Sequence, residues 1–382
     1  MKKRILMLLP NGFDPDPRVY REALSLVKNS YEVTILAWDR EMKFPLSEVK
    51  DGIRIERLRI QSTYGKGTAQ LPLLLLFWAK VVFRAFRMSF DCIHCHDFNT
   101  LPPGFVLSKV KRKPIIFDAH ESYHEMLAPN VLPAIKTVIA YTERILIRHI
   151  DRLITVGSIL EAEYKRRGAK ATCVVGNWKS LEEFQVSPDR VVEEKRILGI
   201  PPERLVVSYV GYFEEGRGLQ ELIKAVKERK TVHLIIGGKG QLEKEIRALV
   251  HNADNITFLG FVKPERIPLY TAIADVIYYG LESDSANNKY SAPNKLFEAL
   301  AAGKAVVTGR LGEIAKIVKE EQCGISLPGI TRDTLHSALD TIQCPETLAM
   351  YKRNALHAGE QKYNWNRAER ELLNMYNSVL QQ

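Results

Sequence analysis

The first half of the chain alternates short apolar runs with stretches whose apolar residues recur at helical spacing. The apolar runs are rich in Leu and β-branched residues, so they predict buried strands. We expect strands at residues 5–9, 32–37, 92–96, 115–118, 153–156 and 172–175, and helices at about 17–28, 70–87, 131–150 and 158–167. This alternation predicts a parallel sheet with helices on both faces.

The second half repeats the alternation after a charged, poorly periodic stretch at residues 179–204. We interpret that stretch as a linker between two doubly wound α/β domains. The expected parts are a first domain at 1–178, a second at 205–362, and a last helix at 363–382 outside both sheets. Strands of the second domain are expected at 205–211, 232–236, 256–259, 275–279 and 305–308.

Unusual residues follow the predicted strands of the first half. The turns carry Asn11-Gly12, His96-Asp97, Asp118-Ala119-His120-Glu121 and Val156-Gly157-Ser158. Ligands of open α/β sheets bind at the carboxyl ends of the strands, so these turns are candidate site segments. Zinc is one interpretation of the segment 92–97. However, strand alternation places Cys92, His94 and His96 on one face and Cys95 on the other, so we expect no metal site.

The composition restricts the classes of partner. The chain has 382 residues, a net charge of +10 and five cysteines. The positive charge favours anionic partners, but the basic residues are scattered and no nucleic-acid-binding motif is present, so we expect no nucleic-acid partner. An odd number of mostly isolated cysteines, with no signal-peptide pattern, favours the cytoplasm.

A glycine-rich loop follows the predicted strand at 205–211. It reads Gly211-Tyr212-Phe213-Glu214-Glu215-Gly216-Arg217-Gly218 and leads into helical spacing. Backbone N–H groups at a helix start, joined by an Arg side chain, can hold a diphosphate. An ordinary turn with a solvated Arg is the alternative.

A second candidate segment runs over residues 287–307. Pro293 suits the first turn of a helix, and Lys295 and Glu298 lie three residues apart near its start. The lysine could meet a phosphate while the carboxylate accepts hydrogen bonds from ribose hydroxyls. A surface ion pair is the alternative.

Together these segments resemble the retaining glycosyltransferases of family 4, which have the GT-B fold. The resemblance covers nearly the whole chain, from Asn11-Gly12 through the turns at 91–97 and 118–121 to the segments 211–218, 237–240, 259–262 and 293–307. It implies an α/β architecture of two Rossmann-like domains that face each other across a cleft. It also implies a final helix that returns to the first domain.

The resemblance further implies a nucleotide-sugar donor, UDP- or GDP-linked, and a glycan or lipid-linked acceptor. No cofactor or metal is expected, and the leaving phosphate would take the acceptor's proton. The expected catalytic residues are His120, Glu121 and Arg217, and the expected donor-binding residues are Gly12, Arg217, Phe261, Val262, Tyr290, Asn294, Lys295 and Glu298.

Two positions depart from the family pattern. Tyr290 stands where the family usually has a first Glu, seven residues before the second Glu, here Glu298. Tyr212 stands where an Arg is common. Arg217 and Lys295 therefore become the main candidates for neutralising the diphosphate. A nucleotide-sugar epimerase and a non-catalytic glycan-assembly partner remain alternatives, while a dinucleotide dehydrogenase is disfavoured because no G-x-G-x-x-G follows the first strand.

The apolar stretch at residues 71–79 is shorter than the roughly 20 residues that span a bilayer, so no transmembrane helix is expected. Lys80, Arg84 and Arg87 follow it along one helical stripe. The helix could pack wholly on the sheet, or it could lie on an anionic membrane. The family's lipid-linked acceptors favour the second, which would place the enzyme peripherally on the inner face of the cell membrane.

Overall fold

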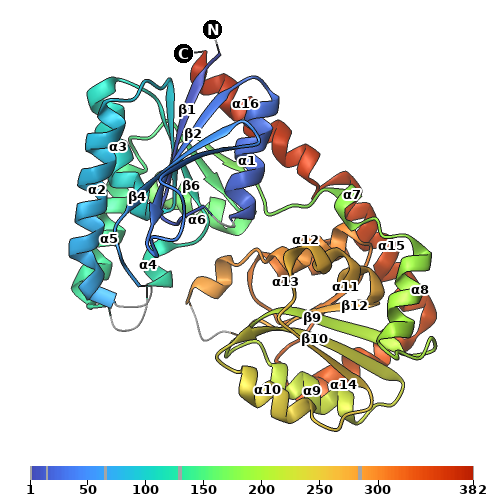
Figure 1. Ribbon diagram of the computed structural model, residues 1–382. Coiled ribbons are helices and arrows are strands. Elements are labelled where there is room, and N and C mark those ends of the chain that lie inside the picture. The colour runs from blue at the N-terminus through green and yellow to red at the C-terminus, as the bar shows by residue number, and fades with distance from the viewer. Residues whose placement is uncertain (1, 14–15, 64–66, 128–130, 283–285, 382) are drawn as a thin grey trace. The chain divides into compact units, whose positions relative to one another are not determined.

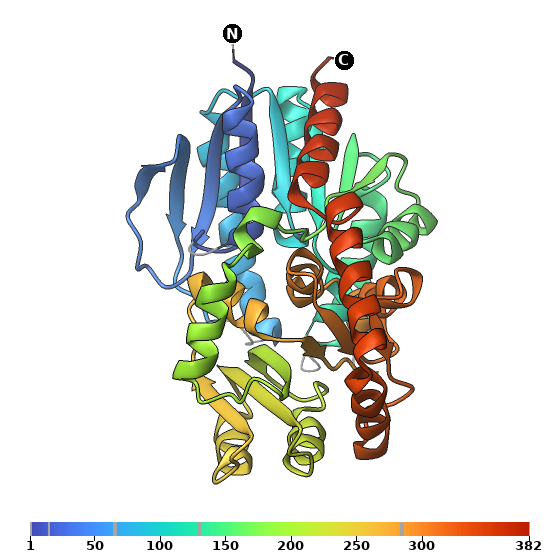
Figure 2. The ribbon, with the colours of Figure 1, turned by 90° about the vertical axis from the view of Figure 1, so that its right-hand side faces the viewer.

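The computed structural model describes residues 2–13, 16–63, 67–127, 131–282 and 286–381. The chain forms two compact units. The first comprises residues 1–176 and 368–382, and the second comprises residues 177–367. Each unit is an α/β layer structure with one sheet, and Figures 1 and 2 show its elements from two sides.

The sheet of the first unit has eight strands in the order β3-β4-β2-β1-β5-β6-β7-β8. All neighbours are parallel except the edge strand β3, which pairs antiparallel with β4. The strands are β1 Arg4–Leu9, β2 Glu32–Asp39, β3 Ser47–Lys50, β4 Ile53–Arg59, β5 Cys92–His96, β6 Ile115–Ala119, β7 Arg152–Thr155 and β8 Thr172–Val174. The strand order reverses between β1 and β5, which is the point where doubly wound sheets bind ligands.

Helices cover both faces of this sheet. They are α1 Pro17–Lys28, α2 Leu71–Phe86, α3 Leu101–Lys111, α4 Tyr123–Met126, α5 Pro133–Leu146 and α6 Ser158–Arg167, with short 3₁₀ turns η1 Gly67–Gln70 and η2 Phe98–Thr100. In Figure 1, α2, α3 and α5 lie together on one side of the sheet, and α1 and the red α16 (Trp365–Leu380) lie on the other. The Tyr376 hydroxyl of α16 lies 2.7 Å from Nδ1 of His94 in β5, so α16 packs on the first sheet.

The second sheet has six parallel strands in the order β11-β10-β9-β12-β13-β14. The strands are β9 Leu205–Phe213, β10 Val232–Gly240, β11 Ile256–Gly260, β12 Val276–Tyr279, β13 Ala305–Thr308 and β14 Gly324–Ser326. This is the Rossmann order, with its reversal between β9 and β12.

Helices α9, α10 and α14 cover one face of the second sheet and α11, α12 and α13 the other (Figure 1). The helices of this unit are α7 Leu181–Phe184, α8 Pro188–Ile197, α9 Leu219–Lys227, α10 Glu243–Val250, α11 Ile267–Ile273, α12 Asn294–Ala301, α13 Gly312–Glu320, α14 Arg332–Gln343 and α15 Pro345–Gln361, with 3₁₀ turns η3 Pro264–Arg266 and η4 Ala286–Tyr290.

The structure differs from the sequence expectations in several elements. Residues 179–204 contain the helices α7 and α8 and belong to the second unit, so they are not an irregular linker. The strands β3 and β4 were not expected, because they lack the continuous apolar run of a fully buried strand, although the alternation in β4 is itself typical of a half-buried strand. Helix α3 was also missed, since its sequence LPPGFVLSKVK holds two prolines and a glycine. Both prolines lie in the first turn, where a helix tolerates them.

Helix α2 also differs from expectation. Together with η1 it forms a segment, Gly67–Phe86, that is long and apolar enough to cross a membrane by length and composition alone. Three of its side chains, Phe77, Val81 and Ala85, are buried within the first unit. Phe77 stacks on Trp38 of β2 with ring centroids 4.6 Å apart. One face of α2 is therefore part of the core of this unit.

Candidate functional site

The candidate site of the first unit lies at the carboxyl ends of β5 and β6. His120, directly after β6, has its Nε2 3.0 Å from Asp118 Oδ2 and its Nδ1 3.4 Å from Asp97 Oδ1. Burial opposes the charged imidazolium, but the two carboxylates outweigh burial and raise the pKa of His120 to about 10. At neutral pH the ring is therefore protonated, so it can donate hydrogen bonds and stabilise negative charge but cannot accept a proton as a base.

The backbone that presents Asp97 is strained. Asp97 has a φ of +59° at the end of β5, a region that residues other than glycine rarely adopt. Its backbone N–H donates to the Asp118 carbonyl at 3.0 Å, and Thr100 Oγ1 donates to the carbonyl of His96 at 2.7 Å. These bonds hold the turn in place, which is common where a backbone positions a functional side chain.

A buried ion network supports His120 from inside the unit. Arg18 of α1 donates to both oxygens of Asp118, from Nε at 3.0 Å and from Nη2 at 2.9 Å, and its Nη1 donates to the carbonyl of Val175 at 2.7 Å. Glu22, one turn further along α1, lies 3.2 Å from the same guanidinium. Arg18 and His120 hold the pKa of Asp118 well below its usual range despite burial. Asp118 is therefore a fixed negative charge that orients His120.

The structure brings together four side chains that could offer metal ligands. Ligand atoms of Glu22, His94, His96 and Asp118 lie within 4.8 Å of one another, and all four residues are buried. Arg18 already occupies both oxygens of Asp118, and a divalent cation here would lie beside its guanidinium. Like-charge repulsion in a buried site therefore disfavours a metal. As expected, His94 and His96 share a face, while Cys95 packs on the other face against Gly104 of α3.

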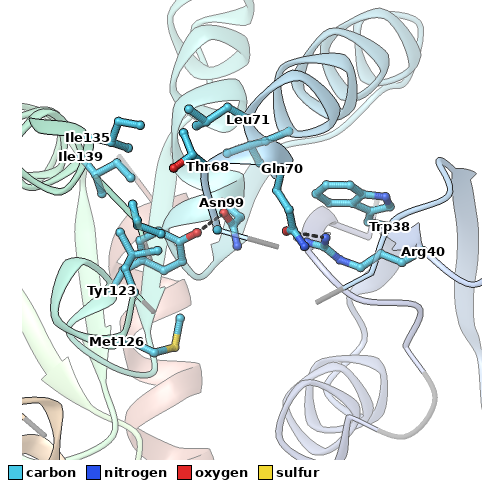
Figure 3. Close-up of a pocket in the computed structure, with 14 residues that line it drawn as sticks. Trp38, Arg40, Thr68, Gln70, Leu71, Asn99, Tyr123, Met126, Ile135 and Ile139 are labelled. Atoms are coloured by element: carbon cyan, nitrogen blue, oxygen red, sulfur yellow. Dashed lines mark hydrogen bonds between the residues drawn. The ribbon is translucent and has the colours of Figure 1, made fainter. Parts of the chain in front are cut away.

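Two adjoining pockets open at this end of the first sheet. The His120 pocket has a volume of about 190 Å³ and is lined by Pro10, Asn11, Arg40, Asp97, Phe98, Asn99, Phe117, Ala119, His120, Glu121, Tyr123 and Met126. A neighbouring cavity of about 290 Å³, the apolar pocket, lies between the starts of α2 and α5 (Figure 3). Arg40, Asn99, Tyr123 and Met126 line both pockets.

Glu121 lines the His120 pocket, as its assignment to the site requires. Gly12 lies after β1, and a Cβ there would come 2.8 Å from the Phe44 ring. Its carbonyl accepts a hydrogen bond from Arg57 Nε at 2.8 Å. Within the first unit, close packing of the loop against Phe44 thus accounts for a glycine at this position.

In the second unit, Arg217 and Lys295 meet at one aromatic ring. The guanidinium carbon of Arg217 lies 4.6 Å from the centroid of the Tyr279 ring, and Lys295 Nζ lies 5.3 Å from the same centroid. Tyr279 is the last residue of β12, so the two cations meet beside the reversal point of the second sheet. A Cβ at Gly211 would come 2.2 Å from Lys295 Nζ, so any other residue here would displace the end of this lysine side chain.

The surroundings of both cations would favour a bound anion. Burial, against the attraction of Glu298 and with repulsion from Arg217, lowers the pKa of Lys295 to about 8. Arg217 Nε donates to Glu214 Oε1 at 2.9 Å, while its buried Nη1 has no hydrogen-bond partner among the described residues. A bound phosphate would supply that partner and favour the charged lysine.

Glu298 lies one turn after Lys295 on α12 and has a cationic neighbour that sequence reasoning missed. Lys179 Nζ donates to Asn294 Oδ1 at 2.7 Å and lies 3.7 Å from Glu298 Oε1. Lys179 falls at the start of the stretch interpreted as a linker, and no local pattern marks it. Its backbone pairs with Asn364, so only the folded unit brings it to α12.

The remaining predicted donor-binding residues lie at separate places in the second unit. Phe261 is 62% exposed after β11, with Lys239 Nζ 5.0 Å from its ring centroid. Val262 packs where a Cβ of Gly237 would stand, at 2.7 Å. Tyr290 is buried in η4 and stacks under Lys289. Phe261 therefore offers an open surface, whereas Tyr290 is part of the packing.

Comparisons with known proteins match both units. The sequence model of the family "Glycosyltransferase Family 4" matches residues 18–182, and that of "Glycosyl transferases group 1" matches residues 191–357. An uncharacterised glycosyltransferase of Methanocaldococcus jannaschii is 23% identical over 381 residues, which is 94% of this chain and 93% of that protein. The chain is a family 4 glycosyltransferase.

Further relatives agree with this assignment. A phosphatidyl-myo-inositol mannosyltransferase of Mycobacterium tuberculosis is 23% identical over 98% of this chain and 97% of its own length. The Anabaena protein HepE, solved in complex with UDP, superposes with a TM-score of 0.74 at 19% identity, covering 99% of this chain and all of that one. The glycosyltransferase therefore has the GT-B fold, as the sequence predicted.

Proposed function

We propose that this glycosyltransferase moves a sugar, with retention of anomeric configuration, from a nucleoside-diphosphate sugar to a glycan or lipid-linked acceptor in surface polysaccharide or glycan assembly. The observation that carries the proposal is the pair of cations at Tyr279. Arg217 and Lys295 place two cations at the end of β12. Glu214 pairs with Nε and Nη2 of Arg217, and the third guanidinium nitrogen, Nη1, has no hydrogen-bond partner among the described residues. A diphosphate matches this arrangement in charge and in hydrogen-bonding capacity.

The other proposed donor contacts come from α12 and from the turn after β11. Glu298, one turn along α12, accepts hydrogen bonds from the ribose hydroxyls. Lys179, which Asn294 holds through a hydrogen bond, orients its carboxylate. Phe261 and Val262 offer backbone contacts to the base. UDP is the first candidate nucleotide, because the Anabaena relative binds UDP, with GDP as the alternative.

The proposed transfer needs no nucleophile from the protein. The acceptor oxygen bonds to the anomeric carbon on the face from which the diphosphate departs, and the departing phosphate oxygen takes the acceptor's proton. Arg217 and Lys295 stabilise the charge that develops on the diphosphate, so no divalent metal is required. His120 remains an imidazolium throughout. Asp118 accepts from its Nε2–H at 3.0 Å, and a sugar hydroxyl competes with Asp97, 3.4 Å away, for its Nδ1–H. Glu121 lines the same pocket and helps to orient the acceptor.

The donor assignment is tested by calorimetry with UDP and GDP on the full chain. Arg217→Ala and Lys295→Ala should each weaken nucleoside-diphosphate binding roughly ten- to a hundredfold, since each removes a charge-assisted hydrogen bond of about 1.5 to 3 kcal/mol. Lys304→Ala is the matched control, because Lys304 is also a buried lysine, its pKa is lowered to about 8, and it follows the other end of α12. Unchanged affinity in both site variants would reject the assignment.

The acceptor side supports contact with a membrane. The outer surfaces of α2, α3 and α5 expose a set of large apolar side chains: Leu75, Leu76, Phe83, Phe86, Val106, Val110, Val138, Tyr141 and Ile145. We call this set the apolar face. The three helices carry a single carboxylate, Glu143, which is buried, alongside six lysine and arginine residues. An apolar face with cations and no exposed carboxylate suits the anionic inner surface of a cell membrane.

Vesicle co-sedimentation tests this contact. The protein should bind vesicles that contain phosphatidylglycerol at low salt and be released as salt rises. Changing Lys80, Arg84 and Arg87 together to Gln should weaken binding, and changing Leu76, Phe83 and Phe86 together to Ser should abolish it. A variant with Val192 and Ile197 changed to Ser is the matched control, since these two residues of α8 are at least as exposed as Leu76, Phe83 and Phe86 but lie outside the apolar face. Absent binding by the parent, or full binding by the Ser variant, would overturn the proposal.

A further inference from the structure

The apolar pocket beside His120 lies between the first turns of α2 and α5 (Figure 3). Its walls are mostly hydrocarbon: Trp38, Leu71, Leu74, Met126, Leu127, Val131, Ile135 and Ile139. Trp38 is held in place at the bottom of the pocket because its ring stacks on Phe77, a fully buried residue of α2. The cavity of about 290 Å³ is close in size to small ligand sites.

The apolar pocket continues into the His120 pocket. Four residues line both, and two of them, Tyr123 and Asn99, form the boundary through a hydrogen bond of 2.6 Å from the tyrosine hydroxyl to Asn99 Oδ1. Burial raises the pKa of Tyr123 to about 12, so its hydroxyl is neutral at every physiological pH, whereas Arg40 brings a guanidinium to the same boundary. A pocket lined by charged groups and a pocket with mainly hydrocarbon walls therefore lie side by side, with the Arg40 guanidinium at their junction.

The two pockets select opposite chemistries. A hydroxyl placed among Leu74, Ile135 and Ile139 would lose its water without gaining a partner, which is costly. A hydrocarbon group in the same place gains free energy from every methylene that it removes from water. At His120 the preference is reversed, because the His120 imidazolium and the carboxylates of Asp97 and Glu121 line that pocket.

We propose that the apolar pocket holds a hydrocarbon segment of the acceptor, attached directly beside the hydroxyl group that receives the sugar. The acceptor is then an amphiphile whose polar head reaches His120 and whose first hydrocarbon units fill the space between α2 and α5. This inference rests on the proposed function, since it takes the His120 pocket as the acceptor site. It differs from the membrane contact, because the pocket residues are distinct from the exposed apolar face.

The test is a chain-length series of alkyl β-D-glucopyranosides, from methyl to octyl, each below its micelle concentration. Calorimetry on the full chain should show affinity rising roughly fourfold for each added methylene until the pocket is full. Ile139→Trp fills the pocket and should weaken hexyl and octyl glucoside at least tenfold. Ile145→Trp is the matched control on the same helix, because Ile145 is exposed and lies outside the pocket.

Two further variants separate binding in the pocket from misfolding and from binding to the exposed apolar face. If Ile139→Trp does not fold, Leu74→Gln places a polar group in the same pocket and should flatten the chain-length dependence. The variant with Leu76, Phe83 and Phe86 changed to Ser should still show the full increase of affinity with chain length. If the alkyl chains bound the exposed apolar face instead, this variant would lose that increase. Equal affinities along the series, or an unchanged series in the pocket variants, overturn the inference. UDP and GDP binding by the same samples reports separately on the donor site, so failure of the proposed function is distinguished from failure of the pocket.

Discussion

The protonation state of His120 is the feature of the site most open to direct measurement. Two carboxylates at 3.0 and 3.4 Å raise its pKa from the ordinary 6.5 to about 10. A displacement of this size corresponds to about 5 kcal/mol in favour of the imidazolium. Replacing one carboxylate, in Asp97→Asn, should lower the pKa of His120 by roughly one to three units.

The assay is a titration of the histidine Cε1–H signals by nuclear magnetic resonance, with His120→Gln identifying the signal among the nine histidines. In the parent, the His120 signal should not titrate between pH 5.5 and 8.5, whereas in Asp97→Asn its midpoint should move down towards that range. A midpoint near 6.5 in the parent would refute the electrostatic argument and would restore His120 as a candidate base.

The same pKa predicts how the fold responds to pH. Because the folded state holds the His120 proton more tightly than the unfolded chain, its stabilisation is complete below pH 6.5 and is lost as pH rises through 10. His120→Gln should therefore flatten the fall in the free energy of unfolding between pH 6.5 and 10. A fall of the same size in the variant would assign the pH dependence to other groups.

Three further predictions concern the donor, the metal and the buried network. Glu298→Gln should weaken binding of a ribonucleotide more than that of its 2′,3′-dideoxy analogue in calorimetry, and equal losses would exclude the ribose contact. Sugar transfer should survive EDTA, whereas complete loss that magnesium or manganese restores would show a metal requirement. Burial raises the pKa of Glu22, against the attraction of Arg18, so ionising this carboxyl should cost the fold stability as pH rises above the ordinary carboxyl range. Denaturant unfolding of Glu22→Gln should lack that cost, and parallel curves for parent and variant would contradict it.

Local pattern was sufficient for much of the fold. The helix expected at 17–28 is α1, and the strands expected at 92–96 and 305–308 are β5 and β13 to the residue. Buried parallel strands read as continuous apolar runs, and their helices carry apolar residues at regular spacing, so both signals are local. Edge elements were missed because β4 alternates apolar and charged residues, one of which, Arg57, becomes buried against the Gly12 carbonyl.

The turns that carry the chemistry were also visible in the sequence by itself. His120 and Glu121 follow a strand, and Arg217 and Lys295 lie at helix starts, so their residue types and positions marked them before any fold was known. What the sequence could not determine is which of them meet. Arg217 and Lys295 are 78 positions apart and share the Tyr279 ring only because β9 and β12 are neighbours in the sheet.

Only the tertiary structure decided the charge on His120, the partner of Glu298 and the apolar space beside the His120 pocket. The pKa of His120 depends on Asp97 and Asp118 from two adjacent strands, and Lys179 reaches α12 from an element that local pattern left undefined. The apolar pocket is lined by residues of α2 and α5 together with Trp38 of β2, which are far apart in the sequence. Electrostatic fields and cavities depend on distances between side chains that are remote in sequence, so periodicity and motif spacing carry no record of them.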